Sequence, residues 1–413
     1  MSGLLEKYND VVGEDVIGQL RELADNVGEI SVVHVNSTKY GGGVAEILAK
    51  LVPMMNELGI RTSWEVIEGD EDFYQTTKSF HNALQGNIVE IPDAMLRNYE
   101  RINERNAEAL RDKLESADIV FIHDPQPAPL LKMTPKRKGK WVWRCHIDAS
   151  RPFRPVWKYL RNFVVEYDAS IFSLANFAQN LPHMQFLIPP SIDPISDKNI
   201  ELPANEIKSV YKEFGIDPER PLISQISRFD RFKDPVGVIW AYKIAKKFLP
   251  GLQLILAGGD AADDPEGAAV IEEVRMAECG DPDIHILLLP PDAHRKINAI
   301  QRASDLVLQK SIREGFGLTV AEALWKHKAV IGGNTGGIRL QIFNHHTGFL
   351  VDSPEGAALR IRYLLFNRDI LRQMGEKGHH FVKNNFLITR HLREYLTVIL
   401  SLLHSEFSRI VIG

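Results

Sequence analysis

Two series of six short apolar runs, separated by helix-like segments, constrain the fold of this 413-residue chain most strongly. Apolar runs of this length that alternate with helical patterns are typical of parallel strands joined by crossover helices. The rhythm stops at Ile188–Pro194, where three prolines interrupt regular structure, and then restarts. The runs are Glu29–Ser37, Arg61–Ile67, Asp118–His123, Lys140–Ile147, Ala169–Leu174 and Gln185–Ile188, then Leu222–Ile226, Leu252–Ala257, Ile284–Leu289, Leu306–Leu308, Ala329–Ile331 and Gly348–Val351.

These runs predict an α/β protein with two Rossmann-like, doubly wound domains. The domains are expected at residues 1–192 and 193–385, with the proline-rich break as the hinge. The last stretch, 386–413, contains an amphipathic segment expected to be a helix that packs back on the first domain. Two such domains facing each other would leave a cleft between the carboxyl ends of their strands, which is where open α/β sheets bind ligands.

Composition excludes several classes of protein. A net charge of -5 without a long basic run argues against a nucleic-acid scaffold. No stretch approaches the roughly 18 apolar residues of a membrane span, and no signal peptide is visible, so a cytoplasmic location is expected. The two cysteines, Cys145 and Cys279, exclude a disulfide framework and a cysteine-based zinc site, and Cys145 is interpreted as a small buried residue.

The stretch Arg313–Glu322 places two carboxylates, Glu314 and Glu322, around a glycine turn between a strand-like run and a helix-like run. Carboxylates bind sugar hydroxyls well because each accepts bidentate hydrogen bonds, and the glycines allow the backbone to approach a ligand. The plainer alternative is that Glu322 stabilises a helix start. A dinucleotide fingerprint is disfavoured, because the third glycine of that motif is missing.

A second cluster, Ser227–Lys233, follows another predicted strand and precedes a helix expected from Pro235. Arg228 and Lys233 would suit a diphosphate, since Arg binds two oxygens at once and Lys acts as a point charge. Fixed cations also stabilise a leaving group that gains negative charge. The alternative is a solvated loop with ion pairs to Asp230 and Asp234.

The first domain carries weaker signals. Gly41–Gly43 opens a helix and could hold a phosphate or sugar oxygen, or could be a plain tight turn. His123-Asp124 and His146-Ile147-Asp148 end two strands, and each carboxylate could orient the nearby imidazole, although a structural histidine is the alternative. Asp70–Asp72 could bind Mg²⁺, but it precedes a helix, where acids stabilise the N-terminus; no metal site is expected.

Taken together, these residues resemble the retaining glycosyltransferases of family 4, which adopt the two-domain GT-B fold. The matching positions are Gly41–Gly43, His146, Arg228 with Lys233 (R-x4-K) and Glu314 with Glu322 (E-x7-E), in this order along nearly the whole chain. Within the family, the trehalose-forming glycosyltransferring synthases are the most similar. The runs that carry this resemblance are Phe121–Pro127, Trp143–Asp148, Leu187–Pro194 and Ser227–Asp230.

The resemblance implies a transfer of glucose from ADP-, UDP- or GDP-glucose to the anomeric hydroxyl of free glucose, giving α,α-trehalose with retention. It implies catalytic roles for Arg228, Lys233, Glu314 and His146. The implied donor-binding residues are Gly42, Gly43, Arg228, Lys233, Glu314, Phe316, Gly317, Leu318, Thr319 and Glu322, and the implied acceptor-binding residues are Asp148, Asp124 and Trp64.

Three alternatives stay open from the sequence: a trehalose phosphorylase releasing glucose 1-phosphate, a GT-B-like sugar-nucleotide epimerase, and a non-catalytic sugar-binding module. No cofactor is expected to be required, although Mg²⁺ could stimulate the reaction. The expected partners are the nucleotide sugar and glucose or trehalose, with neither nucleic acid nor membrane, and the resemblance favours a homodimer.

Overall fold

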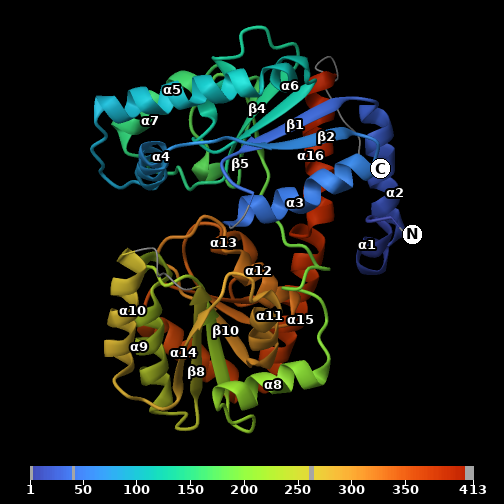
Figure 1. The fold of residues 1–413 in the computed structure, drawn as a ribbon. Helices are drawn as coiled ribbons and strands as arrows, with labels where there is room; N and C mark the ends of the chain where they lie inside the picture. The colour runs from blue at the N-terminus through green and yellow to red at the C-terminus, as the bar shows by residue number, and fades with distance from the viewer. Residues whose placement is uncertain (1–2, 40–41, 260–264, 405–413) are drawn as a thin grey trace. The chain divides into compact units, whose positions relative to one another are not determined.

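A computed structural model of the chain describes residues 3–39, 42–259 and 265–404. Two compact units are present: unit 1 comprises residues 1–190 with the segment from 388 onward, and unit 2 comprises residues 191–387. Each unit contains one parallel six-stranded sheet with helices on its faces (Figure 1). The predicted α/β fold class is confirmed, and all twelve predicted apolar runs contain strands.

The sheet of unit 1 has the strand order β2-β1-β3-β4-β5-β6, with every neighbouring pair parallel. Strand β1 lies between β2 and β3. The chain therefore crosses from β1 to β2 on one side and then returns past β1 to form β3 on the other side. Its strands are β1 (Ser31–Asn36), β2 (Arg61–Val66), β3 (Ile119–His123), β4 (Lys140–Cys145), β5 (Ala169–Phe172) and β6 (Met184–Leu187).

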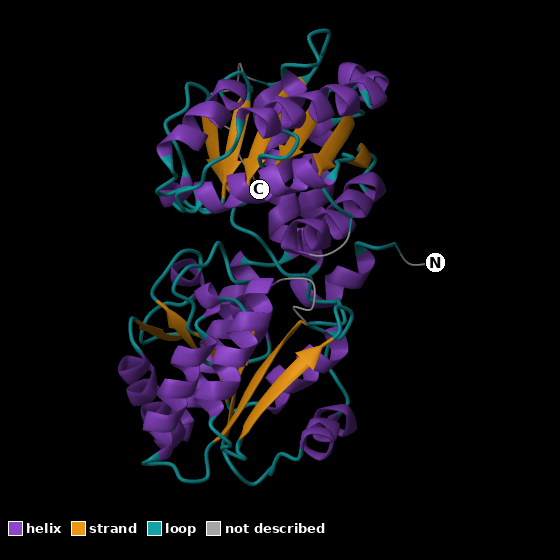
Figure 2. Cartoon of the chain, turned by 60° about the vertical axis from the view of Figure 1, so that its left-hand side comes forward, coloured by secondary structure: helices purple, strands orange, loops and turns teal. Residues whose placement is uncertain are grey.

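Helices cover both faces of this sheet, as Figure 2 shows. The predicted polar helical stretch between β2 and β3 is divided into α4, α5 and α6. The helices of unit 1 are α1 (Glu6–Val12), α2 (Glu14–Val27), α3 (Gly42–Glu57), α4 (Glu71–Leu84), α5 (Asp93–Ala109), α6 (Arg111–Ser116), α7 (Arg154–Val164) and α16 (Ile388–Leu403), with 3₁₀ turns η1 (Ala128–Leu131) and η2 (Ala175–Phe177).

The C-terminal helix α16 packs against α2 and α3 of unit 1 (Figure 1). Its sequence is strongly amphipathic, and its inner face buries Leu392, Tyr395 and Ile399 completely or nearly so. The guanidinium of Arg390 donates to the carbonyl oxygens of Pro189 and Pro190, which fixes the start of α16 to the last residues of the first segment.

The sheet of unit 2 has the order β12-β11-β10-β7-β8-β9, again parallel throughout. Strands β7 and β10 are parallel, so the loops that follow them leave the same edge of the sheet. Because the two strands are also neighbours, these loops begin side by side. The strands are β7 (Leu222–Ile226), β8 (Gln253–Gly259), β9 (Ile284–Leu289), β10 (Leu306–Gln309), β11 (Val330–Gly333) and β12 (Gly348–Val351). The helices are α8 (Ala204–Phe214), α9 (Pro235–Lys246), α10 (Pro265–Glu278), α11 (His294–Ala303), α12 (Leu318–Trp325), α13 (Ile338–Gln341), α14 (Pro354–Phe366) and α15 (Arg368–Asn385), with the 3₁₀ turn η3 (Arg231–Lys233).

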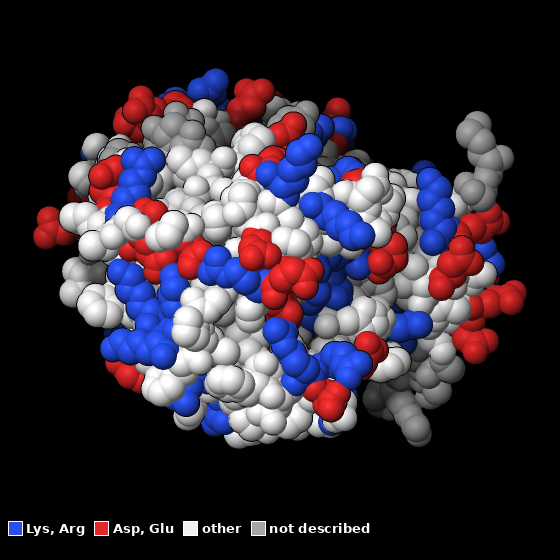
Figure 3. Space-filling view, turned by 90° about the horizontal axis from the view of Figure 1, so that it is seen from below, with Lys and Arg blue, Asp and Glu red and all other residues white. Residues whose placement is uncertain are grey.

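Basic and acidic side chains are interspersed on the face shown in Figure 3, without an extended area of one sign. Within the described part of the chain, no helix is both long and apolar enough to cross a bilayer.

Candidate functional site

The two charged motifs of unit 2 meet at the carboxyl edge of its sheet. The Lys233 Nζ lies 2.6 Å from Glu314 Oε2, although 81 residues separate them. Lys233 ends the 3₁₀ turn after β7 and Glu314 follows β10, so the adjacency of these strands brings the residues together. Ser311 donates a second hydrogen bond to the same carboxylate oxygen, at 3.1 Å. The side chains of Lys233 and Glu314 are only 17% and 9% exposed, which makes this a largely desolvated ion pair.

The glycine turn after Glu314 is held by close backbone packing. Gly317 has a φ of +81° and forms the N-cap of α12, a conformation that favours glycine. A Cβ on Gly336 would lie 1.7 Å from the Glu314 carbonyl oxygen, so the turn at 336–337 can approach only because it lacks side chains. The first N–H groups of α12, including those of Leu318 and Thr319, have no acceptor within the helix and point out of its N-terminus.

Other predicted residues of this turn are partly committed to the protein itself. The Phe316 side chain is buried and packs edge-on against Phe386, with ring centroids 5.5 Å apart. The Thr319 hydroxyl donates to Gln309 Oε1 at 3.0 Å. Only the backbone N–H groups of these two residues therefore remain for a ligand.

Glu322 is buried on α12, with 3% of its surface exposed. One turn further, the equally buried Lys326 donates to the Glu322 carbonyl oxygen and to Asn199 Oδ1, at 3.0 and 2.9 Å. Burial lowers the pKa of Lys326 to about 7, while the nearby Glu322 carboxylate opposes this shift. Glu322 thus lies deeper than a residue that merely stabilises a helix start, and Lys326 is a neighbour that the sequence motifs did not reveal.

Arg228 is 79% exposed at the end of β7 and contacts Asp230 at 3.3 Å. This contact is one of the surface ion pairs that the sequence offered as the alternative to a diphosphate site. The other expected pair does not form, because Asp234 caps α9 through the Gly237 N–H and forms an ion pair with Lys310 instead. Lys310 is nearly buried and follows β10 directly; its position after a predicted strand was the available signal for it.

Unit 1 carries a row of three histidines across its central strands: His34 lies within β1, His123 ends β3 and His146 directly follows β4. His34 Nδ1 lies 3.0 Å from His123 Nε2, and His123 Nδ1 lies 3.0 Å from His146 Nε2. Burial lowers the pKa of all three imidazoles, to about 3 for His34 and well below the usual range for His123 and His146. The imidazoles are therefore neutral, and the sequence reading missed His34 because it lies inside an apolar strand.

The carboxylates next to these histidines have other roles than the expected one. Asp124 Oδ1 accepts the backbone N–H of His146 at 2.7 Å, and burial raises the Asp124 pKa to about 7. Asp148 Oδ1 accepts the backbone N–H of Ser150 at 2.9 Å. The ring nitrogens of His123 are bound by histidines rather than by Asp124, so the interpretation that the adjacent acid orients this imidazole is wrong.

The remaining predicted residues of unit 1 lie at the first two strands. The Trp64 indole N–H donates to Asn36 Oδ1 at 2.8 Å, which leaves only the face of the partly exposed ring for a ligand. Gly42 begins α3 with a φ of +80° and is exposed, and Gly43 follows it. The predicted residue Gly41 lies outside the described residues.

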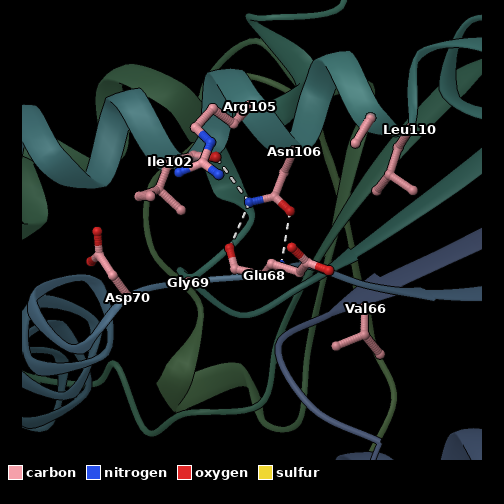
Figure 4. Close-up of a pocket in the computed structure, with 9 residues that line it drawn as sticks. Val66, Glu68, Gly69, Asp70, Ile102, Arg105, Asn106 and Leu110 are labelled. Atoms are coloured by element: carbon pink, nitrogen blue, oxygen red, sulfur yellow. Dashed lines mark hydrogen bonds between the residues drawn. The ribbon is translucent and has the colours of Figure 1, made fainter.

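A cavity of about 360 Å³ lies beside the end of β2, between the following loop and α5 (Figure 4). Asn106 fixes that loop, since its side chain accepts from the Glu68 N–H and donates to the Glu68 carbonyl, both at 2.8 Å. The lining contains none of the predicted site residues; it consists of Val66, Glu68, Gly69, Asp70, Ile102, Arg105, Asn106, Ala109 and Leu110.

Asp70, which lines that cavity, is the N-cap of α4 and accepts the Phe73 N–H at 2.9 Å. Its neighbours Glu71 and Asp72 occupy the first turn of the helix. The helix-start interpretation of Asp70–Asp72 is confirmed. Among the residues that the structure describes, no group of three or more His, Cys, Asp or Glu side chains is arranged to hold a metal ion.

Comparison with known families matches both parts of the chain. Residues 34–179 match the family model described as trehalose synthase, N-terminal domain, and residues 207–381 match glycosyl transferases group 1. The chain is 46% identical to the trehalose synthase of Thermococcus litoralis over 96% of both chains, and 41% identical to that of Rubrobacter xylanophilus over 97% of both. It is 29% identical to the trehalose phosphorylase of Pleurotus pulmonarius, over 86% of this chain and 55% of that protein.

Solved structures of the GT-B fold are similar along nearly the whole chain. A trehalose-6-phosphate protein from E. coli bound with UDP-2-fluoro glucose has a TM-score of 0.73 at 14% identity, covering 90% of this chain and 99% of that one. Sucrose-phosphate synthase from Thermosynechococcus elongatus has a TM-score of 0.71 at 16% identity, covering 91% and 100%. At such identities the similarity shows the fold alone, and the predicted GT-B fold is confirmed.

Proposed function

The chain belongs to the trehalose synthase family of glycosyltransferases, and we propose that it transfers glucose from a nucleoside-diphosphate glucose to the anomeric hydroxyl of free glucose. The product would be α,α-trehalose. The observation that carries this proposal is the Lys233–Glu314 pair beside the glycine turn, which joins a cation for phosphate and a carboxylate for sugar hydroxyls at one edge of unit 2.

In this proposal, unit 2 holds the donor. Arg228 and Lys233 bind the diphosphate, which gains negative charge as the sugar C1–O bond breaks. Lys233 is partly desolvated, so its attraction to that developing charge is less screened by water than at an open surface. Arg228 is exposed and bound only loosely to Asp230, which leaves its guanidinium able to reorient toward two phosphate oxygens.

The glucose and ribose of the donor would be bound along the turn and α12. Glu314 and the backbone N–H groups of Phe316, Gly317 and Leu318 are assigned to the glucose, and Glu322 to the ribose hydroxyls. A buried carboxylate suits this task, because burial removes most of its hydrogen bonds to water. The ribose hydroxyls would supply hydrogen bonds to Glu322 in their place. Thr319 contributes through its backbone only, since its hydroxyl is bound to Gln309.

Unit 1 would supply the acceptor contacts. Asp148 and Asp124 are assigned to hydroxyls of free glucose, and the face of Trp64 to one apolar side of the sugar ring. His146 is assigned to a hydroxyl of the transferred glucose, and the N–H groups of Gly42 and Gly43 to phosphate. Since His146 is neutral, it would act as a hydrogen-bond partner and not as a charge.

We propose retention by front-side displacement. In this step the acceptor hydroxyl oxygen forms the new bond to C1 while the bond from C1 to the diphosphate oxygen breaks. The leaving phosphate takes the electron pair of that bond and accepts the hydroxyl proton. The charge on the departing oxygen is then balanced by Arg228 and Lys233.

A trehalose phosphorylase is the second candidate, favoured by the 29% identity to proteins of that activity. Such an enzyme would need phosphate and no nucleotide. Two observations support the synthase instead. The identity to the synthases is higher and covers 96% of their length, and a phosphorylase would offer no ribose to the buried Glu322.

The proposal is tested by measuring release of nucleoside diphosphate from ADP-glucose or UDP-glucose with and without free glucose. Release that depends on glucose, and that falls in Glu322→Gln through a raised KM for the nucleotide sugar, is the expected result. Release that is equal without glucose, or no release with any nucleotide sugar, would overturn the proposal.

A further inference from the structure

The hydrogen-bonded row His34–His123–His146 constrains which ring nitrogen of His146 carries a proton, a property that the proposed function does not specify. Its imidazoles come from β1, from β3 and from the residue that directly follows β4, and each ring stacks on or bonds to the next. Ring centroids are 5.3 Å apart in both pairs. His34 also stacks on Phe121 at 4.8 Å, so the inner end of the row is enclosed by aromatic surface.

A neutral imidazole has a proton on only one of its two ring nitrogens, so one nitrogen donates a hydrogen bond and the other accepts one. In a row of neutral imidazoles, all the hydrogen bonds therefore point in the same direction. If His34 Nδ1–H donates to His123, then His123 Nδ1–H donates to His146 Nε2, and the proton of His146 is on Nδ1. If the direction is reversed, the last proton is on His34 Nε2. Every bond in the row therefore depends on where the last proton lies.

The two ends of the row differ in a way that chooses between these directions. His34 Nε2 is fully buried and has no hydrogen-bond partner. A buried N–H without an acceptor is among the rarest defects in proteins, and a bare acceptor atom is better tolerated. At the other end His146 is only half-buried, and its Nδ1 is not among the enclosed nitrogens, so an N–H there can reach a ligand or water.

Burial keeps the row neutral, and neighbouring groups on β4 and α16 add to its effect. The Arg144 guanidinium, on β4, adds to burial in lowering the pKa of His123 and His146, and His391 on α16 acts on His146 in the same direction. Arg144 is itself fixed, because it donates to the Ile188 carbonyl at 2.7 Å. The carboxylate of Asp124 accepts from the backbone N–H of His146 and not from its ring.

We infer that His34 and His123 are positioning residues, which hold His146 as the Nδ1–H tautomer so that it presents a hydrogen-bond donor to an oxygen of its ligand. In this arrangement His146 cannot remove a proton through Nδ1. The inference rests on the proposed function only in taking that ligand to be a sugar.

The test is the ring ¹⁵N spectrum of the full-length protein labelled with [¹⁵N]histidine, recorded from pH 6 to 9. The His146 signals are identified by their loss in His146→Asn. The expected result is an Nδ1–H pattern for His146 throughout this range. An Nε2–H pattern or a titrating imidazolium at His146 in the unmodified protein would overturn the inference.

Two variants of His123 separate positioning from packing. His123→Phe keeps a ring of similar shape but neither donates nor accepts, whereas His123→Gln can still accept from His34 and donate to His146. We expect His146 in the Phe variant to move toward the Nε2–H form that free histidine prefers. We also expect kcat/KM for glucosyl transfer to fall about tenfold, the loss of one hydrogen bond. The Gln variant should restore both.

His391→Phe is the matched control, because His391 is equally buried in the same unit but lies outside the row and stacks on Tyr395. It should leave the His146 tautomer unchanged. If the Phe variants at 123 and 391 had the same effect, packing would explain it and the inference would fall. Absence of glucosyl transfer together with an Nδ1–H pattern would instead refute the proposed function and leave the row as described.

Discussion

The ion pair between Lys233 and Glu314 makes the sharpest prediction, through the variant Lys233→Met. Methionine keeps the length of the side chain and removes its charge. The Glu314 carboxylate, 9% exposed, would then retain the Ser311 hydroxyl as its remaining side-chain hydrogen bond. An uncompensated charge in a largely desolvated place destabilises the folded protein.

The expected loss of stability is about 3 kcal/mol, the lower end of the range for breaking a buried pair, because water still reaches both groups and Ser311 remains. For a unit of about 200 residues this corresponds to a Tm lowered by roughly 6–12 °C. The double variant Lys233→Met with Glu314→Gln removes both charges, and most of the loss should be recovered.

Arg228→Met is the control that separates stability from activity. Arg228 is 79% exposed and loosely paired, so the free energy of unfolding should change by less than about 0.5 kcal/mol. Since both cations are assigned to the leaving diphosphate, each single variant should lower kcat by about 10²–10³. The assay combines thermal unfolding with glucose-dependent release of nucleoside diphosphate.

Two results would refute this reasoning. If Lys233→Met unfolded at the wild-type temperature, the pair would not be a desolvated interaction. If Arg228→Met kept the wild-type kcat while the fold was intact, the assignment of the diphosphate to this cluster would be wrong.

Three further predictions concern buried or committed groups. Burial lowers the folded-state pKa of Lys326 from 10.5 to about 7, so the stability that Lys326 contributes is lost as pH falls from about 10 through 7. In Lys326→Met, the free energy of unfolding measured in urea should lack this dependence on pH. An unchanged pH dependence would contradict the burial argument. Burial raises the folded-state pKa of Asp124 from 3.8 to about 7, so the stability that Asp124 contributes is lost as pH rises from about 4 through 7. Asp124→Asn should remove this loss of stability. It should also keep the hydrogen bond from the His146 N–H, which amide exchange at His146 would show. Trp64→Phe should raise the KM for glucose less than Trp64→Ala, because the indole N–H is already bound to Asn36; equal effects in steady-state kinetics would remove the stacking role.

The sheets could be predicted from the sequence because parallel strands buried on both faces appear as continuous apolar runs. The contact of Lys233 with Glu314 was foreseeable in outline, since both motifs follow strands and such strands end at one edge. The strand order that makes β7 and β10 neighbours was not encoded in either motif. It follows from which crossovers return across the sheet.

The interior polar groups were harder to foresee. His34 lies between Val33 and Val35 in an apolar strand, where a lone histidine resembles a core residue. Its role depends on His123 and His146, which come from strands far along the chain. Lys310 and Lys326 were missed for the same reason, because the partners Asp234 and Asn199 are distant in sequence. Pairings of this kind are set by tertiary structure and have no local pattern.

The most direct test of the account follows the products of two incubations by NMR. One contains the protein with ADP-glucose or UDP-glucose and free glucose, and the other contains trehalose and phosphate. The account predicts trehalose with both linkages α in the first, and no glucose 1-phosphate in the second. Glucose 1-phosphate in the second with no product in the first would contradict it, and would leave the buried Glu322 without a ribose to bind.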